Sequence, residues 1–385
     1  MKHINRIQLG NIQESLSRFK VVALIGPRQV GKTTLAKQIL SKKDLWLDLE
    51  RPSDHRKLGD AETFLSMHKD KLVCIDEVQL SPDLFPVLRA HVDSTDSKGQ
   101  FLILGSASPE LLKQSSETLA GRIIYIELNP FSILEVASNE SYDLWLKGGY
   151  PNSFLSSEEH SLEWRDAYIK TFLERDLAIL GYRRSSTQMR RFWTMLAHLQ
   201  GQTLNQSKLA GSLDTTSPTI KSFIDMMVDT FMVRVIQPWH ANIKKRLVKA
   251  PKIYIRDSGL LHALLDIETM DQLQSNPVYG ASFEGFAIEQ VLNSISTRWK
   301  SSFYRSAKGE EIDLILQLRE KTIAIEIKCS KAPSLTDKNK KALETIKPDH
   351  TFILSLVDEP YDLSPEMTVT NIPSLIQNIL DLEEE

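Results

Sequence analysis

The sequence of 385 residues has a net charge of −3, with 25% charged and 41% apolar residues, a composition typical of soluble globular proteins of two or three domains. Its two cysteines, Cys74 and Cys329, lie far apart in apolar runs, which disfavours a disulfide framework or zinc site and favours a reducing cytoplasm. No run reaches the roughly 18 apolar residues of a membrane span, and no apolar run follows the N-terminus as in a signal peptide. We therefore expect a cytoplasmic protein that has no membrane partner.

A phosphate-binding motif follows the first predicted strand. The apolar run 21–25 precedes G-x-x-x-x-G-K-T, and a helix is predicted over 35–40, so the motif stands in a strand–turn–helix context. Glycines let backbone N–H groups point into one concavity, to which the helix N-terminus adds partial positive charge. Lys32 is predicted to reach the β- and γ-phosphates and the Thr33 hydroxyl to ligate Mg²⁺, whereas the alternative is an ordinary glycine turn. The predicted nucleotide-binding residues are Gly26, Pro27, Arg28, Gln29, Val30, Gly31, Lys32, Thr33 and Thr34.

Strands alternate with helices through the rest of this first part. Helices are predicted over 4–19, 61–67 and 85–92, and strands over 45–49, 72–77, 100–106 and 123–128. Such alternation favours a mostly parallel sheet that helices cover on both faces.

Polar residues at the ends of the third and fourth predicted strands suggest hydrolysis. Asp76 and Glu77 directly follow four apolar residues, at the sheet edge where Mg²⁺ and an attacking water would lie beside the phosphate-binding loop. We assign Asp76 to Mg²⁺, through water, and Glu77 to polarising the nucleophilic water, although acidic residues also end strands without a catalytic role. Ser106 is predicted to contact the γ-phosphate or the water. Arg122 is a candidate to meet the negative charge of phosphoryl transfer, and Arg175 is a second, in cis or from a neighbouring subunit; either could equally be an ion-pair arginine.

Residues 7–129 resemble an AAA-type P-loop ATPase domain. The residues that carry this resemblance are Gly26 to Thr33, Cys74-Ile75-Asp76-Glu77-Val78-Gln79, Gly105-Ser106-Ala107-Ser108 and Leu119-Ala120-Gly121-Arg122. The whole chain is similar to prokaryotic ATPases in which such a domain is fused to a C-terminal region of uncharacterised function. The resemblance implies ATP instead of GTP, in agreement with the lack of a guanine-reading N-K-x-D motif, and it implies assembly into a homo-oligomer.

The pattern changes after Pro130. Helices are predicted over 131–146, 158–180, 204–210 and 217–227, and strands over 231–236 and 252–256. The later elements are typical of a helix-turn-helix unit whose two strands form a winged hairpin around Lys244-Lys245-Arg246. A small helical packing unit without nucleic-acid contacts is an equally good interpretation.

Charge is distributed unevenly. Residues 183–256 contain thirteen Lys and Arg but three Asp and no Glu, a net charge of +10 in a chain whose total is −3. This asymmetry predicts a polyanionic partner for the segment, most simply DNA. The alternative is a basic face that pairs with an acidic neighbouring domain.

The C-terminal part contains a second group of carboxylates. Helices are predicted over 283–295 and 337–346, and strands over 303–305, 311–316, 322–328 and 352–356. Alternation places Glu326 and Lys328 on one face of their strand, and Asp313 on the adjacent strand could complete a pair that holds Mg²⁺ against a phosphodiester, with Lys328 orienting or deprotonating water. These residues resemble the core of restriction-endonuclease-like nucleases, with Glu284 as the helical match and Glu289 as a lesser one. The alternative is alternating charge on an exposed sheet face, although a bare carboxylate within the apolar run around Glu326 would be costly.

These patterns predict an α/β chain of four parts. They are a P-loop AAA-type ATPase core over 1–130, a helical extension over 131–182, a basic winged-helix-like module over 183–275 and a nuclease-like α/β domain over 276–385. We expect Mg²⁺-dependent ATP hydrolysis coupled to DNA binding, with DNA cleavage left open. One alternative is an ATP-regulated DNA-binding remodeller with a silent nuclease fold, and another is a nucleotide switch that acts on a protein partner.

Overall fold

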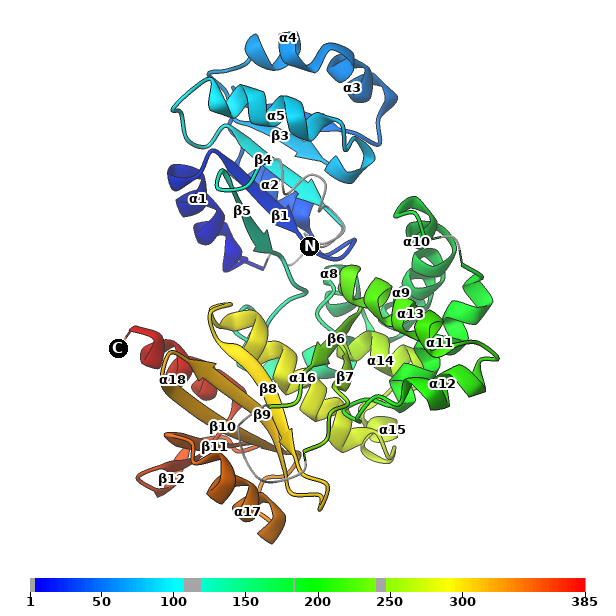
Figure 1. Cartoon of the computed structure of the whole chain (residues 1–385), viewed down its shortest axis with the longest axis vertical. Helices are drawn as coiled ribbons and strands as arrows, with labels where there is room; N and C mark the ends of the chain where they lie inside the picture. Colours follow the sequence, from blue (N-terminus) through cyan, green and yellow to red (C-terminus); the bar gives the residue numbers. More distant parts are fainter. Residues whose placement is uncertain (1–3, 107–118, 183, 240–246, 385) are drawn as a thin grey trace.

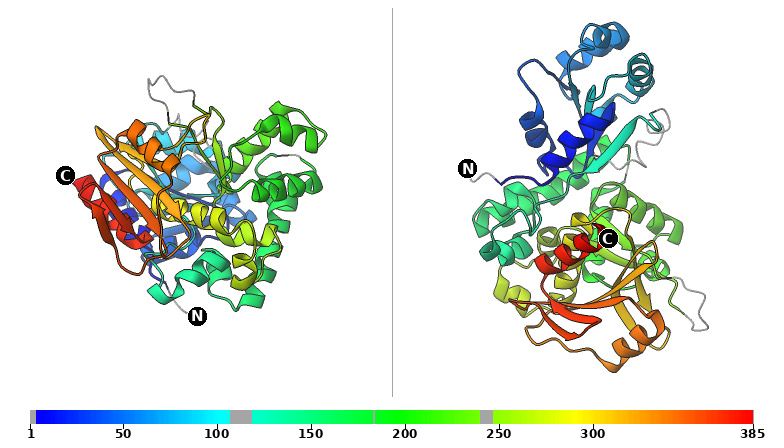
Figure 2. Two further views of the ribbon diagram at one scale, coloured as in Figure 1. Left: turned by 90° about the horizontal axis from the view of Figure 1, so that it is seen from below. Right: turned by 90° about the vertical axis from the view of Figure 1, so that its left-hand side faces the viewer.

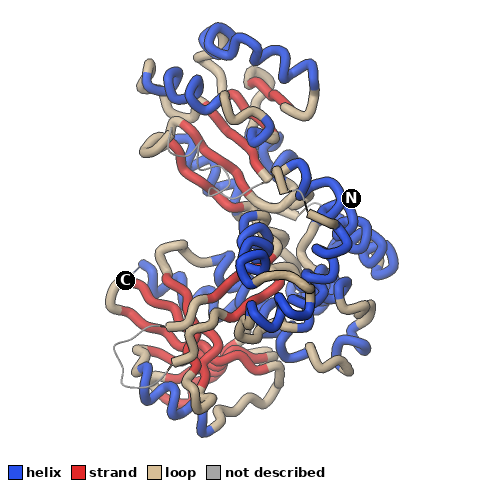
Figure 3. The backbone as a smooth tube through the Cα atoms, turned by 45° about the vertical axis from the view of Figure 1, so that its right-hand side comes forward, coloured by secondary structure: helices blue, strands red, loops and turns tan. Residues whose placement is uncertain are grey.

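The computed structural model describes residues 4–106, 119–182, 184–239 and 247–384. One lobe holds the first sheet with its helices, and a second lobe holds the central helices and the C-terminal sheet side by side (Figure 1). Figure 3 shows that strands gather in these two sheets and that helices dominate the centre of the chain. No helix within the described ranges combines the length and apolar character needed to cross a membrane.

The first sheet is parallel, as predicted, with the order β2-β3-β4-β1-β5. Its strands are β1 (Val21–Ile25), β2 (Leu45–Asp48), β3 (Val73–Asp76), β4 (Phe101–Gly105) and β5 (Ile123–Glu127). Each lies within one residue of its predicted bounds. The side chains of β1 alternate between two apolar clusters, with Ala23 in one and Leu24 in the other, because both faces of this sheet are covered.

Helices on the two faces supply the rest of these clusters. The α-helices among the described residues of this lobe are α1 (Gln8–Arg18), α2 (Lys32–Ile39), α3 (Pro52–Lys57), α4 (Ala61–Ser66) and α5 (Leu84–Asp93). Ile12 of α1 and Leu35 of α2 pack with Leu24, whereas Leu65 of α4 and Leu88 of α5 pack on the opposite face. Because these strands are parallel, the carboxyl ends of β1, β3 and β4 lie at one edge of the sheet. Helix α2 begins at the same edge.

The central region is mainly helical. Its elements are α7 (Ser141–Lys147), α8 (Pro151–Phe154), α9 (Glu158–Thr171), a π-helical turn (Phe172–Asp176), α10 (Leu177–Ile179), α11 (Ser186–His198), α12 (Gln206–Ser212), α13 (Ser217–Asp229), β6 (Val233–Ile236), β7 (Lys252–Ile255), α14 (Ser258–Leu264) and α15 (Met270–Gln274). The predicted helix pair and antiparallel hairpin are confirmed. The Thr216 side chain accepts from the backbone N–H of Thr219, and Pro218 occupies the first turn of α13, where its missing N–H costs nothing. Arg183 and Lys244-Lys245-Arg246 lie outside the described residues.

The predicted helix over 131–146 is wrong in its first half. Residues 131–137 are loop and turn, and only α7, after a single 3₁₀ turn at Ser138–Glu140, is α-helical. The backbone N–H of Phe131 donates to the Gly149 carbonyl, and that of Ile133 donates to Gln290 Oε1 at 2.7 Å. These contacts with distant residues hold the segment in a non-helical conformation, which the local pattern does not reveal.

The C-terminal sheet is mixed, with the order β12-β13-β11-β10-β9-β8. Its elements are α16 (Tyr279–Ser294), β8 (Lys300–Arg305), β9 (Glu311–Leu318), β10 (Lys321–Lys328), α17 (Asp337–Ile346), β11 (His350–Ser355), β12 (Tyr361–Ser364), β13 (Met367–Thr370) and α18 (Ile372–Glu384). The views in Figure 2 show α18 and α17 on opposite sides of this sheet. The predicted helices and strands up to β11 are confirmed, whereas β12, β13 and α18 were not predicted.

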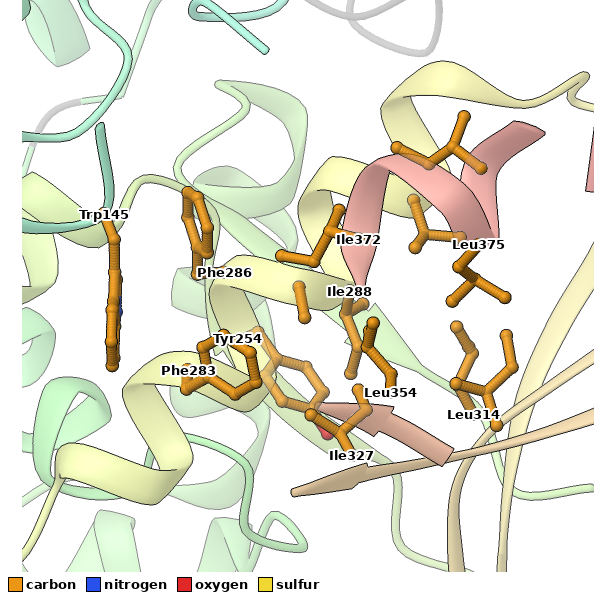
Figure 4. Packing of buried hydrophobic residues seen from close by; sticks show 14 of the residues in the cluster. Trp145, Tyr254, Phe283, Phe286, Ile288, Leu314, Ile327, Leu354, Ile372 and Leu375 are labelled. Atoms are coloured by element: carbon orange, nitrogen blue, oxygen red, sulfur yellow. The ribbon is translucent and has the colours of Figure 1, made fainter. Parts of the chain in front are cut away.

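The central region and the C-terminal domain share one apolar core. Trp145 of α7 stacks against Tyr279 and Phe286 of α16, and its indole N–H donates to Ser282 at 2.9 Å. Figure 4 shows Trp145 next to Phe286 in this core. Tyr254 of β7 lies in the same cluster as Ile327 of β10. Because this core contains residues of both regions, the central region and the C-terminal domain form one packed body.

Candidate nucleotide site

The phosphate-binding loop adopts a conformation that only glycine can supply at two of its positions. Gly26 has a φ of +147° and Gly31 a φ of +100°. A Cβ at Gly26 would lie 2.3 Å from the Leu128 carbonyl oxygen, so no side chain fits there. Lys32 begins α2 directly after Gly31, so the free N–H groups of the first helical turn face the loop.

Lys32 is buried beneath this loop. Its ammonium donates to the Gly26 carbonyl at 2.8 Å and to the Pro27 carbonyl at 2.7 Å. Burial lowers the pKa of Lys32 to about 8, an effect that the charges of Glu77 and Asp76 oppose. The loop therefore presents a cation that can lose its proton in mildly alkaline solution.

This lowered pKa predicts a pH dependence of ATP capture. Below pH 8 the ammonium is protonated and can attract phosphate, whereas above pH 8 it becomes neutral in the free protein. We expect kcat/KM for ATP to decrease as pH rises through about 8, approaching about tenfold per pH unit. Steady-state rates from pH 6.5 to 9.5 at fixed ionic strength measure this. A kcat/KM that stays constant up to pH 9.5 would contradict it.

Four predicted side chains, from the start of α2 and the ends of β3 and β4, meet next to the loop. The Thr33 hydroxyl donates to Asp76 Oδ2 at 2.8 Å, which joins the start of α2 to the end of β3. Glu77 follows with a left-handed backbone, φ +56°, and its Oε2 accepts from the Ser106 hydroxyl at 3.4 Å and from the amide of Gln79. Burial raises the pKa of Asp76, against the opposing hydrogen bond from Thr33. The hydroxyl and carboxylate oxygens of Thr33 and Asp76 are the donors that Mg²⁺ prefers, so this pair fits the ion.

The central region closes one side of this site. A cavity of about 440 Å³ is lined by the phosphate-binding loop, β3 and Ser106, and also by Asn152, Arg175 and Asp176. Arg175 and Asp176 belong to the π-helical turn, a rare element that is often found at functional sites. The Arg175 guanidinium lies 3.7 Å from Glu50, next to β2. Of the two predicted arginines, Arg175 is thus the one that reaches the cavity within the same chain.

Arg122 lies elsewhere. Its guanidinium pairs with Asp93 at the end of α5 and donates to the Ala120 carbonyl at 2.9 Å. The described residues that line the cavity do not include it. A role for Arg122 at the phosphates stays a prediction, to which the arrangement within one chain lends no support.

Arg28 of the loop has a connection that the sequence did not reveal. It binds Asp176 of the π-helical turn, donates to Glu50 at 2.7 Å and lies 3.7 Å from Glu77. One guanidinium therefore touches the loop, the predicted catalytic carboxylate and the central region. Asp176 lies 148 residues after Arg28 in the sequence, so no pattern of neighbouring residues could predict that they pair.

The structure brings four of the predicted C-terminal residues together. Glu284 of α16, Asp313 of β9, and Glu326 and Lys328 of β10 lie around one end of the mixed sheet. Glu289, the lesser match, lies apart from them and pairs with Arg234 and Arg256. The residues missed by sequence reasoning are Lys252, Tyr254 and Asn339, which contact the predicted set, and Glu311, which pairs with Lys252.

Some basic residues of the central segment form ion pairs within the chain and so are not available to a partner. Arg234 and Arg256 bind Glu289, and Arg256 also donates to Glu127 at 2.6 Å. Lys252 is 2% exposed and binds carboxylates of the C-terminal domain. The alternative of a basic face that pairs with acidic neighbours is therefore correct for these three residues. The remaining basic residues that are described and exposed are Arg184, Arg190, Arg191, Lys208, Lys221 and Lys249.

Family models match three consecutive parts of the chain. An AAA domain matches residues 18–137, the domain of unknown function DUF8612 matches 138–271, and the domain of unknown function DUF4143 matches 279–375. The AAA match agrees with the parallel sheet and phosphate-binding loop, and it identifies the N-terminal part as a P-loop ATPase-like, nucleotide-binding domain. The DUF4143 match does not assign a nuclease fold to the C-terminal domain.

Solved structures give weaker likenesses. The Walker-type ATPase PABY2304 of Pyrococcus abyssi is 15% identical with a TM-score of 0.47, covering 68% of this chain and 95% of that one. The RuvB Holliday junction branch migration motor of Thermotoga maritima is 15% identical with a TM-score of 0.28, covering 69% and 96%. Likenesses at this level carry no argument about function.

Two full-length relatives place the chain in a family. The uncharacterized proteins Mb2031c of Mycobacterium bovis and Rv2008c of Mycobacterium tuberculosis are each 43% identical over 365 residues. The match covers 94% of this chain and 82% of each relative. The N-terminal part of this chain is an AAA-type P-loop domain. The chain as a whole belongs to the family of Mb2031c and Rv2008c.

Proposed function

We propose that this chain hydrolyses ATP with Mg²⁺ and uses the hydrolysis to regulate contacts of its central region with DNA. The observation that carries the hydrolysis is the convergence of Thr33, Asp76 and Glu77 on a cavity floored by the phosphate-binding loop. A loop alone explains binding of a nucleotide. A second carboxylate next to the Thr33–Asp76 pair also supplies a group that can act on water.

Each residue has a role that follows from its position. Lys32 and the N–H groups at the start of α2 would bind the phosphates. Thr33 and Asp76 would hold Mg²⁺, which neutralises phosphate charge when bound. Glu77 would orient the attacking water and accept its proton, and Ser106, hydrogen-bonded to Glu77, would hold that carboxylate in place. Arg175 would place a positive charge where negative charge develops.

Two arginines support coupling between this site and the rest of the chain. Arg28 joins the loop and Glu77 to Asp176 of the central region. Arg256, next to β7, joins Glu127 at the end of β5 to Glu289 of α16. A change in the charge around Arg28, such as binding of a phosphate chain, would alter its pairing with Asp176. Through these ion pairs, nucleotide binding in the first lobe would change contacts made by the second lobe.

DNA is the proposed partner because most of the exposed basic residues described in the central region lie on its helical unit. Arg190 and Arg191 lie on α11, Lys208 on α12 and Lys221 on α13, and all four are exposed. Contacts with phosphates would make DNA affinity strongly dependent on salt. We propose no cleavage step, because Lys252, Ile327 and Asn339 already bind the C-terminal carboxylates. The C-terminal domain then acts as a fixed partner of the DNA-binding unit.

The test is the rate of ATP hydrolysis with duplex, single-stranded and branched DNA. We expect DNA to stimulate turnover, and the Arg190→Ala/Arg191→Ala variant to lose most of that stimulation and to lower the salt slope of DNA affinity by about 1 per lost contact. Lys42→Ala/Lys43→Ala, which removes two exposed charges from the first lobe, is the matched control. If no nucleic acid changes turnover or binds in a salt-dependent manner, the DNA proposal fails and a protein partner becomes the better candidate.

A further inference from the structure

A buried lysine lies at the centre of the C-terminal carboxylates. Lys252 Nζ is 2.9 Å from Glu284 Oε1, 2.9 Å from Glu311 Oε1 and 3.1 Å from Asp313 Oδ1. The ammonium has three hydrogens, and each has a carboxylate acceptor at hydrogen-bonding distance. The ammonium also lies over the ring of Phe303, 5.6 Å from its centroid, and Lys252 is 2% exposed.

Lys252 comes from a different element than the carboxylates that surround it. It begins β7 of the central region, whereas its three partners lie on α16 and β9. Tyr254 points the same way two residues later, as alternation along a strand requires, and its hydroxyl donates to Glu284 Oε1 at 2.6 Å. Strand β7 therefore inserts two polar side chains into the C-terminal domain.

The remaining donors do not fit a magnesium site. Asp313 Oδ2 accepts from the backbone N–H of Ile327 at 3.1 Å, while Glu326 Oε1 accepts from Lys328 at 2.6 Å and from Asn339 at 2.8 Å. Glu326 Oε2 is buried without a hydrogen-bond partner among the described residues. Within the same ranges, no group of three or more His, Cys, Asp and Glu side chains is arranged to hold a metal ion. Both oxygens of Asp313 and Oε1 of Glu326 are thus engaged by other groups, which leaves one free oxygen on this predicted pair of Mg²⁺ ligands.

We infer that the Lys252 ammonium is the resident cation of this cluster, which makes the cluster an ionic joint between the central region and the C-terminal domain and not a metal centre. A monovalent ammonium and a divalent ion cannot share one position, because they would compete for the same carboxylate oxygens. Removing Lys252 leaves Glu284, Glu311 and Asp313 buried next to one another without a counter-charge, which is unfavourable. A divalent cation would then be the simplest replacement.

The experiment measures Mn²⁺ binding to the nucleotide-free full chain by electron paramagnetic resonance. Each protein is also measured with Asp313→Asn. The difference in bound Mn²⁺ between the two measurements gives the Mn²⁺ held by the cluster and not by the nucleotide site. In the unmodified protein we expect Asp313→Asn to leave Mn²⁺ stoichiometry unchanged. In the Lys252→Met background we expect one additional Mn²⁺ per chain, which Asp313→Asn removes.

The melting temperature is a second, independent measurement of whether Lys252 is the counter-charge of the cluster. Lys252→Met should lower the melting temperature, and Mn²⁺ should restore part of the loss, whereas Lys249→Ala, an exposed lysine three residues away, should have no effect. Mn²⁺ bound by the unmodified protein with a stoichiometry that Asp313→Asn lowers would overturn the inference. So would a melting temperature that Lys252→Met leaves unchanged.

Discussion

Replacing Lys32 by alanine is expected to reduce ATP hydrolysis by at least roughly 10²-fold and to weaken ATP binding. Lys32 is the buried cation of the phosphate-binding loop, where its ammonium is held by the Gly26 and Pro27 carbonyls. Low solvent access makes such a charge more effective toward phosphate than a surface lysine. Phosphate release and equilibrium binding of a fluorescent ATP analogue measure the two effects.

The control for this substitution lies on the same helix. Lys37 is exposed on α2, with its ammonium over the Trp46 ring at 5.2 Å. Lys37→Ala removes the same charge from the same element without touching the loop, so we expect near-normal turnover. Hydrolysis that survives Lys32→Ala at the wild-type rate would show that the phosphates bind somewhere else.

Replacing Glu77 by glutamine is expected to separate binding from chemistry. Glutamine keeps the size and one oxygen but cannot accept the proton of an attacking water, so kcat should decrease by about 10²–10⁴-fold. Thr33, Asp76 and Lys32 are unchanged, so ATP affinity should stay close to that of the unmodified protein. Single-turnover hydrolysis and ATP binding on the same preparations distinguish the two.

Glu62→Gln provides the matched comparison, because Glu62 is an exposed carboxylate on α4 in the same lobe. We expect it to leave both kcat and ATP affinity unaffected. If Glu77→Gln instead loses ATP binding while its residual turnover per bound ATP is normal, Glu77 acts on the structure of the loop through Arg28 and not on water.

The parts that could be predicted from the sequence rest on local patterns. The runs 21–25 and 101–105 are apolar on both faces and lie between turn residues, so their strands and the parallel sheet follow. The loop could be located because glycine at 26 and 31 is required by backbone geometry. Asp76 and Ser106 could be placed at one site because the carboxyl ends of parallel strands meet at one sheet edge.

The parts that could not be predicted depend on contacts between distant segments. Strand β12 is exposed along its length, and the loop at residues 131–137 is held by hydrogen bonds from Phe131 to Gly149 and from Ile133 to Gln290, which no local pattern indicates. Lys252 counts as a basic surface residue in any charge sum, yet it is buried against Asp313, 61 residues later. The sequence therefore overstated the charge available to a polyanion.

The most direct test of the account is phosphate release from ATP by the purified full chain, measured with Mg²⁺, with EDTA, and in the Glu77→Gln variant under conditions where ATP binding is saturated. We predict hydrolysis that requires the divalent cation and that Glu77→Gln lowers by about 10²-fold or more although the nucleotide stays bound. Hydrolysis that proceeds equally in EDTA, or in the Glu77→Gln variant, would contradict the assignment of this site as a Mg²⁺-dependent ATPase.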